Sequence, residues 1–341
     1  LRRLHSADVR MTVLRKLQCH HRYIITLLSS MTIMLFLYFQ NSVKVFTYDS
    51  YRYVFEQAQC ACRTCVLDRR GSDWFSVRYK PTTPLLLNSH NSVLRADVSR
   101  WWKGLQNVSH VGNYTEVVEH LFSLFPDKEH YSDAGPDRCR TCAVVGNSGN
   151  LKGSHYGLII DSNDFVMRIN KGPTKGYEKD VGSKTTHRFI YPESASDMDN
   201  STHLVLSPFK ILDMEWLISA FTTKHIHLTY MEVPATVKAN EHKVMILHPE
   251  FIKYVHDNWT ANHGRYPSTG FLTLIFALHI CDEVNVFGFG ATRDGNWNHY
   301  FDDTLTSYVN GSHGGDFEYI TINRLHQEKM ILMRSIGHEV G

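Results

Sequence analysis

The first clear pattern along the chain is an uninterrupted apolar run near its start. Tyr23 to Gln40 holds eighteen residues without a charged side chain, which is just enough for a helix that crosses a membrane. By the positive-inside rule, the N-terminus is predicted in the cytosol and everything after Gln40 in the lumen, as in a type II signal anchor. The basic residues before the run, set against the single acid Asp8, are Arg2, Arg3, Arg10, Arg15, Lys16 and Arg22.

A cleaved signal peptide is the alternative explanation of this run. It would need a shorter apolar core and a small-x-small cleavage site, which the segment Gln40–Phe46 fits poorly. We therefore predict a cytosolic tail (1–22), a transmembrane anchor (23–40), a short polar and aromatic stem (41–59) and one lumenal domain (60–341). The initiator is predicted at Met11 or upstream of the sequence given.

Beyond the anchor, short apolar runs stop abruptly at glycine and asparagine. Ala143–Val145 runs into Gly146-Asn-Ser-Gly-Asn150, and Asp164–Asn170 also ends on an Asn. These patterns predict buried strands that end in tight turns, where open α/β sheets bind their ligands. Glycine lets a ligand approach the backbone and Asn both donates and accepts, which suits the sugar and phosphate of a nucleotide better than a metal. The spacing matches neither a dinucleotide fingerprint nor a P-loop, and an ordinary Asn/Gly turn explains it equally well.

A second group of elements follows later in the chain. The apolar run Phe271–Cys281 has helical length and follows Ser268, a plausible N-cap, and a free helix N-terminus is a natural phosphate site. Asn285–Gly290 then predicts a buried strand, so that strand, helix and strand form a doubly wound α/β layer. Further strands are predicted at Leu204–Phe209 and His225–Tyr230, and further helices at Val117–Phe125, at Asp213–Ala220 and from His248 onward.

Composition and charge narrow the partners of this domain. The net charge of +2, from 36 basic and 34 acidic residues, gives no signal for a nucleic acid or another polyanion. Of seven cysteines, Cys19 precedes the anchor, and the even number of six after it fits three disulfides in an oxidising compartment. Two Cys-x-x-Cys pairs could instead bind zinc, which a secretory location argues against. The six allow fifteen pairings; they are Cys60, Cys62, Cys65, Cys139, Cys142 and Cys281.

Three other polar patterns bear on the chemistry. Asp197-Met-Asp199 could hold a divalent metal on a diphosphate, as in many nucleotide-sugar transferases, but the sequon that follows it favours an exposed loop. His225-x-His227 could be a metal pair, although the period of a strand places such residues on one face in ordinary sheets. Five sequons after the anchor are candidate glycosylation sites, at Asn107, Asn113, Asn200, Asn258 and Asn310.

Several of these stretches together resemble the motifs of the animal sialyltransferases. Cys142–Asn150, followed by Asp180–Thr186, is similar to the large sialylmotif, and His263–Gly290, with its Tyr-Pro-Ser-Thr-Gly, resembles the small one. His299-Tyr-Phe-Asp302 resembles the third motif and His313–Glu318 the very small motif, whose pattern is His-x-x-x-x-Glu. The resemblance extends from about Cys60 to the C-terminus and is strongest to α-2,3 enzymes that act on Galβ1-3GalNAc.

The resemblance implies a fold, a reaction and a location. The fold would be a single-domain α/β structure with a mainly parallel Rossmann-like sheet, a variant of the GT-A class. The donor would be CMP-sialic acid, and the galactose 3-hydroxyl of glycoprotein or glycolipid acceptors would attack with inversion, without cofactor or metal. The enzyme would lie in the Golgi membrane. The resemblance leaves open whether it forms a homodimer. The rivals are a metal-dependent glycosyltransferase and a catalytically silent glycan binder, which would lack one His.

The resemblance also assigns roles to individual residues. His313 would be the general base, as suits a histidine in the mildly acidic Golgi, and His299 would hydrogen-bond the departing phosphate. The loop between them is about three residues shorter than in close relatives, which affects the acceptor fit. The implied disulfides are Cys142–Cys281, Cys60–Cys65 and Cys62–Cys139. The implied donor-side residues are Asn147, Ser148, Asn170, Ser268, Thr269, Gly270 and Tyr300, and the acceptor-side residues are Gln106, Tyr230 and Tyr266.

Overall fold

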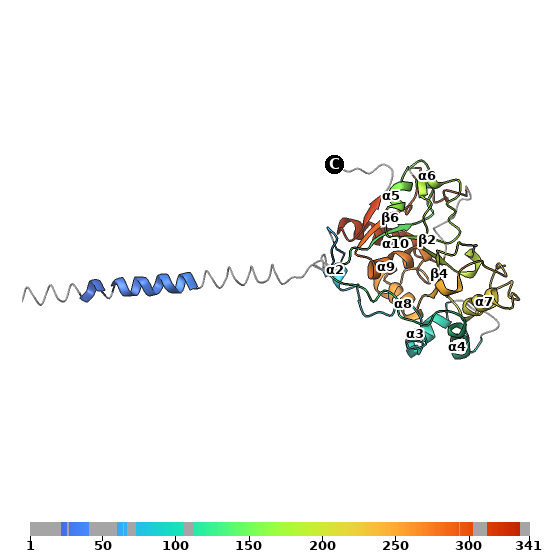
Figure 1. The fold of residues 1–341 in the computed structure, drawn as a ribbon, viewed down its shortest axis with the longest axis horizontal. Helices are drawn as coiled ribbons and strands as arrows, with labels where there is room; N and C mark the ends of the chain where they lie inside the picture. Colours follow the sequence, from blue (N-terminus) through green and yellow to red (C-terminus); the bar gives the residue numbers. More distant parts are fainter. Residues whose placement is uncertain are drawn as a thin grey trace, which may run out of the picture. The chain divides into compact units, whose positions relative to one another are not determined.

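The computed structural model describes residues 22–25, 27–40, 60–63, 65–66, 73–105, 112–292, 294–302 and 312–334. The chain divides into two units, 1–57 and 58–341 (Figure 1). In the first unit, the helix Arg22–Gln40 has 19 residues and a mean hydropathy of 1.6, which by length and composition is enough to cross a membrane. The predicted helix is therefore confirmed, whereas its place in a membrane and the division into tail, anchor and stem stay predictions.

The second unit alternates strands with helices over most of its length. Its strands are β1 (Thr141–Val145), β2 (Phe165–Ile169), β3 (His187–Ile190), β4 (His203–Leu206), β5 (Val244–Ile246), β6 (Glu283–Phe287) and β7 (Leu332–Arg334). Its helices are α2 (Asp73–Ser76), α3 (Ala96–Lys103), α4 (Tyr114–Leu124), α5 (Gly157–Asp161), α6 (Glu178–Val181), α7 (Ile211–Phe221), α8 (Pro249–Tyr254), α9 (Thr269–Ile280) and α10 (Gly315–Gln327). Shorter 3₁₀ turns lie at Gly149–Leu151, Pro192–Ser194 and Glu241–Lys243, and a π-helical turn lies at Val255–Trp259.

All seven strands form one parallel sheet in the order β5-β4-β3-β2-β1-β6-β7. The chain therefore builds outward from β1 in one direction as far as β5 and then returns to the other side of β1 with β6. The α/β class and the predicted strands at 143–145, 164–170 and 285–290 are confirmed. Because the chain changes direction at β1, a crevice opens between the ends of β1 and β6, which is where such sheets bind ligands.

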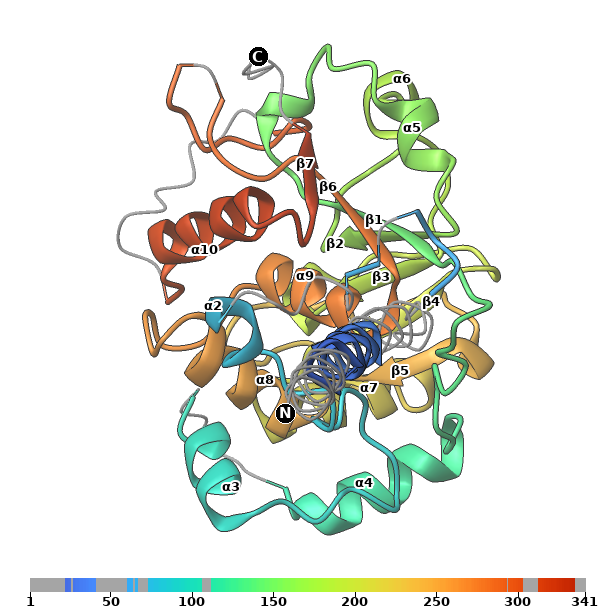
Figure 2. The ribbon, with the colours of Figure 1, turned by 90° about the vertical axis from the view of Figure 1, so that its left-hand side faces the viewer.

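The sheet is covered on both faces, which explains why its strands are nearly continuous apolar runs. Alternate residues of β1 point to opposite sides: Val144 belongs to the larger core, and Ala143 and Val145 to a smaller one with α5 and α6. In Figure 2, the strands run between α5 and α6 on one side and α8 and α9 on the other.

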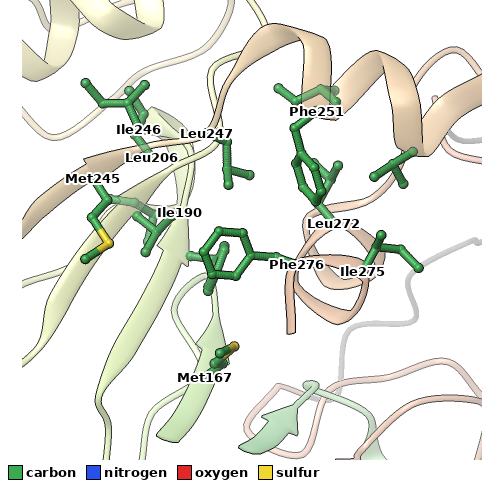
Figure 3. Close-up of a cluster of buried hydrophobic side chains, with 14 of the residues drawn as sticks. Met167, Ile190, Leu206, Met245, Ile246, Leu247, Phe251, Leu272, Ile275 and Phe276 are labelled. Carbon is green, nitrogen blue, oxygen red and sulfur yellow. The ribbon is translucent and has the colours of Figure 1, made fainter. Parts of the chain in front are cut away.

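Helix α9 forms the centre of the larger core. It is apolar on every side and almost fully buried, as expected of a helix enclosed by other elements. Figure 3 shows Leu272, Ile275 and Phe276 of α9 between Phe251 of α8 and side chains of the neighbouring strands such as Ile190. The predicted N-cap is confirmed, because the Ser268 hydroxyl accepts from the Phe271 amide at 3.1 Å. This rigid burial fixes the helix N-terminus in place.

One predicted strand is wrong. Residues 225–230 form no strand; Leu228 instead pairs with Glu232 in an isolated bridge, which makes a short hairpin. The physical reason lies in α7, whose Ser219 hydroxyl accepts from the amides of His225 and Ile226 at 3.0 and 3.1 Å. These amides are thus bound locally and do not enter a ladder. The other predicted elements correspond to β4, α4, α7 and α8.

Three disulfides link parts of the second unit, and one of them, Cys62–Cys139, ties its first residues to the segment before β1. They have the pairing that the resemblance implies, Cys60–Cys65, Cys62–Cys139 and Cys142–Cys281. The last one joins β1 to the residue that ends α9, across 139 positions of sequence. It therefore links the two stretches whose ends form the crevice.

Candidate active site

A cavity of about 340 Å³ lies at the carboxyl ends of β1 and β6, where the chain changes direction. Its lining combines strand ends, the N-terminus of α9 and the first turns of α10. The lining residues are Gly146, Asn147, Ser148, Ile169, Asn170, Tyr191, Ser268, Thr269, Gly270, Gly288, Phe289, Gly290, Trp297, His299, His313, Gly315, Glu318, Tyr319 and Ile322. Two histidines and all but one of the predicted donor-side residues are thus brought together from five separate stretches.

The turn after β1 is packed directly against the turn after β6. A Cβ at Gly146 would collide with the carbonyl oxygen of Gly288, so only glycine allows the two strand ends to approach this closely. The Ser148 hydroxyl donates to the carbonyl of Gly290 at 2.6 Å, and the Asn147 amide nitrogen donates to the carbonyl of Ile169 at 3.1 Å. The turn is therefore fixed to β6 on one side and β2 on the other.

The end of β2 is closed by an unusual backbone conformation. Asn170 has a φ of +53°, in the left-handed region that asparagine tolerates better than most residues. Its side-chain oxygen accepts from the Ser194 hydroxyl at 3.0 Å, and its carbonyl accepts from the buried Arg188 guanidinium at 2.7 Å. This explains why the apolar run ends on Asn, and it holds Asn170 at the cavity wall.

The N-terminus of α9 is held by a residue of α10. Glu318 is 3% exposed and accepts from both the amide and the hydroxyl of Ser268, at 2.7 and 2.6 Å. Burial raises the pKa of Glu318, while the Ser268 hydrogen bonds and nearby His313 oppose that rise. The amides of Thr269 and Gly270 begin the helix beside the cavity. This end of α9 has the N–H groups and the dipole that favour a negatively charged ligand, and its use as a phosphate site stays a prediction.

His313 lies just before α10 with one ring nitrogen engaged. Its Nδ1 is 3.0 Å from the carbonyl oxygen of Tyr266, so Nδ1–H donates to that oxygen and the basic lone pair is on Nε2. Its backbone pairs with Gly264, where a Cβ would collide with the Gly314 amide. The Tyr266 ring also packs edge-on at 5.0 Å. These contacts hold the imidazole in one orientation and leave Nε2 free of the Tyr266 contact.

His299 approaches the cavity from the opposite segment. It pairs through its backbone with Ser148, and its ring stacks on Phe301 with centroids 5.0 Å apart. Burial lowers the pKa of His299, and Asp302 opposes that effect. The imidazole thus lies beside the turn after β1, where it can donate one N–H to an anion.

Neither predicted acceptor-side tyrosine, Tyr266 or Tyr230, is among the residues that line the cavity, but a series of side-chain contacts, here called the acceptor wall, connects both to His313. The Tyr266 ring is 4.7 Å from Phe209, and the ammonium of the next residue, Lys210, lies 4.7 Å from the centroid of Tyr230. Tyr266 is buried whereas Tyr230 is half exposed, so the wall runs from the base toward solvent. Gln106 lies outside the described residues.

Several other predicted residues lie elsewhere. Tyr300 is buried beneath the lining, where its hydroxyl donates to the carbonyl of Pro173 at 2.6 Å and its amide to that of Asn147 at 2.9 Å. It supports the turn after β1 rather than facing the cavity. Asp197 and Asp199 are exposed and accept from the amides of Lys238 and Ser201, at 2.9 and 2.7 Å.

The sequons differ in their surroundings. Asn113 and Asn200 are exposed, whereas Asn258 is half-buried in the π-helical turn and its sequon partner Thr260 is fully buried. Asn107 and Asn310 lie outside the described residues. Glycosylation at all five stays a prediction.

Sequence reasoning missed a group of aromatic lining residues. Tyr191, Phe289, Trp297 and Tyr319 face the cavity from four different segments. Phe289 stands between two glycines of the expected strand end, which was a usable signal. The other three carry no local pattern that separates them from ordinary core aromatics. They give the cavity apolar walls around its polar strand ends, as ligand sites usually have.

The fold and the cavity together indicate a class: an α/β protein with a nucleotide-type ligand site at its switch point and two histidines in the lining of that site. Comparison with known proteins agrees. The model of glycosyltransferase family 29 (sialyltransferase) matches residues 86–330, and the chain belongs to this family.

Individual relatives and solved structures are also similar. CMP-N-acetylneuraminate-beta-galactosamide-alpha-2,3-sialyltransferase 1 of Gallus gallus is 46% identical over 281 residues, 81% of this chain and 82% of that protein. CMP-N-acetylneuraminate-beta-galactosamide-alpha-2,3-sialyltransferase 2 of Mus musculus is 47% identical over 275 residues, 80% of this chain and 79% of that protein. A crystal structure of a mammalian sialyltransferase in complex with Gal-beta-1-3GalNAc-ortho-nitrophenol matches with a TM-score of 0.76 at 46% identity, covering 81% of this chain and 99% of that one.

Proposed function

We propose that this protein is a β-galactoside α-2,3-sialyltransferase that transfers sialic acid from CMP-sialic acid to terminal Galβ1-3GalNAc. The observation that carries the proposal is His313, whose Nδ1–H is bound to the Tyr266 carbonyl so that Nε2 is the proton acceptor. The names of the relatives and the disaccharide bound in the similar crystal structure support the same donor and acceptor.

The reaction is a single displacement with inversion. The galactose O3 forms a bond to the anomeric carbon of sialic acid while the bond from that carbon to the CMP phosphate breaks, and its electron pair leaves with the phosphate. The O3 proton moves to Nε2 of His313. Tyr266 fixes the base by its carbonyl, and with Tyr230 it forms the wall along which the disaccharide lies. Gln106 is assigned to the same side by resemblance.

The donor lies across the turn after β1 and the start of α9. Among the residues that the structure describes, the cavity lining holds no lysine or arginine. The negative charge of the phosphate is therefore met by N–H groups: those of Thr269 and Gly270 at the start of α9, and that of His299. Asn147 and Asn170, at the two strand ends, bind the ribose or base.

The reaction needs no metal in this proposal. A pyrimidine monophosphate carries less charge than the diphosphate donors that other transferases bind through an Asp-x-Asp pair. Asp197 and Asp199 are instead occupied by backbone amides and lie in an exposed segment. Their arrangement supports a structural role in that loop.

The glycosyltransferase fold class and the cellular location of the protein are part of the same proposal. A single compact unit around one sheet supports a variant of the GT-A class over a class with two facing Rossmann domains. The apolar helix Arg22–Gln40 and three disulfides support a type II protein of the Golgi membrane with its catalytic domain in the lumen. Protease treatment of sealed microsomes should then spare the domain after residue 60, and digestion without detergent would refute the orientation.

The activity is tested with the full chain, radiolabelled CMP-sialic acid and a panel of disaccharides. Galβ1-3GalNAc should accept the label, and an α-2,3-specific sialidase should release it. Absence of transfer to any galactoside, together with normal CMP binding, would show a silent binder. Loss of activity in excess EDTA that manganese restores would show a metal-dependent transferase.

A further inference from the structure

A short hairpin at the outer end of the acceptor wall exposes an unusual set of side chains. In Leu228–Glu232, the end residues form an isolated bridge and the Thr229 amide donates to the Met231 carbonyl at 2.9 Å. Leu228, Tyr230 and Met231 are 61%, 50% and 57% exposed. Three large apolar side chains are thus exposed within four residues, and clustered exposed apolar side chains on soluble proteins often mark an interaction site.

The hairpin is exposed, yet polar side chains beneath it fix its position. The Thr229 hydroxyl donates to Glu193, in the 3₁₀ turn directly after the lining residue Tyr191. The Lys210 ammonium lies beneath the Tyr230 ring and pairs with the fully buried Asp213 at 2.6 Å. A patch that is fixed in place by buried polar groups costs little ordering entropy when it binds.

The hairpin is also continuous with the acceptor side of the cavity. From His313, ring contacts lead through Tyr266 to Phe209, the residue before Lys210, and Lys210 contacts Tyr230. Leu228 and Met231 flank Tyr230 on either side. Under the proposed function, a disaccharide that extends from His313 toward Tyr230 would bring its carrier close to these two side chains.

We propose that the Leu228–Glu232 hairpin docks on the lipid surface around a membrane-borne glycolipid acceptor. The proposal rests on the proposed function and deepens it by naming the carrier. An O-glycosylated peptide is rich in polar residues and offers little to Leu228 and Met231, whereas a bilayer interface accepts apolar tips beside a tyrosine and a lysine. Exposed Lys224 supplies that lysine four residues before Leu228.

The chain carries its own candidate for attachment to a bilayer. The helix Arg22–Gln40 is long and apolar enough to span one. A galactose linked to ceramide through a short glycan stands close to the lipid surface, so the hairpin must approach that surface whenever the site engages the sugar.

The test compares two acceptors in one preparation. The full chain is reconstituted into phosphatidylcholine vesicles that contain ceramide-linked Galβ1-3GalNAc, and soluble Galβ1-3GalNAc disaccharide is offered to the same vesicles in a parallel reaction. The ratio of the two rates is independent of how many molecules face outward. Leu228→Ser with Met231→Ser should lower this ratio about tenfold or more, since two large apolar side chains lose their burial.

The matched control is Leu158→Ser, which removes an apolar side chain that is 88% exposed on α5 and should leave the ratio unchanged. An unchanged ratio in the hairpin variant, or an equal fall in the control, would overturn the proposal. So would a selective loss with a peptide-linked acceptor, which would assign the hairpin to a protein carrier. If the wild-type chain transfers nothing to the soluble disaccharide, the proposed function itself fails, and that outcome is distinct from all the others.

Discussion

Replacing His313 tests the mechanism most directly, provided that the roles of its two ring nitrogens are tested separately. His313→Ala removes both the proton acceptor Nε2 and the Nδ1–H bond of 3.0 Å to Tyr266. His313→Asn is the matched variant, because the amide nitrogen of Asn lies close to the position of Nδ1 and can still donate to the Tyr266 carbonyl. The Asn variant therefore keeps the backbone anchored while it lacks a base.

Loss of the base and loss of the hydrogen bond to Tyr266 should have effects of different size. A positioned general base contributes about 10²–10⁴-fold, which corresponds to about 2.7–5.4 kcal/mol of the barrier. The hydrogen bond to Tyr266 contributes only about 0.5–1.5 kcal/mol to folding. Both variants should therefore lose kcat to the same extent, and only the Ala variant should also lose stability.

The assay measures initial rates with saturating CMP-sialic acid and disaccharide, CMP affinity by calorimetry, and the denaturant midpoint of each variant. CMP binding should stay within a few-fold of wild type, because the phosphate is met by α9 and His299. His299→Ala should differ by raising the KM for the donor as well as lowering kcat. A kcat for His313→Asn within tenfold of wild type, with intact CMP binding, would refute the base assignment. Each variant is repeated with Asn310→Gln, so that a glycan near His313 does not confuse the comparison.

Three further outcomes follow from the same structure. Cys142→Ser should lower the free energy of unfolding by about 2–5 kcal/mol and reduce secretion, because it opens the bond to Cys281 between β1 and α9; peptide mapping that finds Cys142 paired elsewhere would contradict this. Asp199→Ala should keep most of its activity in excess EDTA, and a total loss that manganese rescues would revive the metal-dependent reading. Burial holds the pKa of His187 well below its usual range, so its contribution to stability is full above about pH 6.5 and is lost as the pH falls. The melting temperature of His187→Gln should therefore fall less between pH 7.5 and 5.5 than that of wild type, and an equal fall would show that other groups dominate.

Elements whose causes lie in neighbouring residues were predictable from the sequence. The apolar run of α9 and its cap at Ser268 are adjacent, and Asn170 tolerates the left-handed turn that ends β2. The three disulfides were reached through the resemblance, because spacing alone left fifteen pairings open. The sheet order also required more than local pattern, since β6 returns beside β1 after four other strands.

Features that depend on a partner outside their own segment could not be predicted in this way. Residues 225–230 have a strand-like pattern, yet the Ser219 hydroxyl binds the amides that a ladder would need. Tyr300 stands in a motif beside His299, yet its hydroxyl is bound to Pro173, 127 residues earlier. In both places a contact outside the segment decides the outcome, and no local propensity encodes it.

Glu318 shows what such a distant contact achieves in this site. The very small motif places Glu318 five residues after His313, and in the structure this carboxyl group is buried and is bound to the amide and hydroxyl of Ser268, fifty positions earlier. Ser268 caps the helix whose N–H groups we assign to the donor phosphate, and Glu318 lies in the first turn of the helix that follows His313. One carboxylate therefore fixes the base and the phosphate site relative to each other. An in-line displacement needs the attacking hydroxyl and the leaving group at a set separation, and this link provides it before either substrate binds.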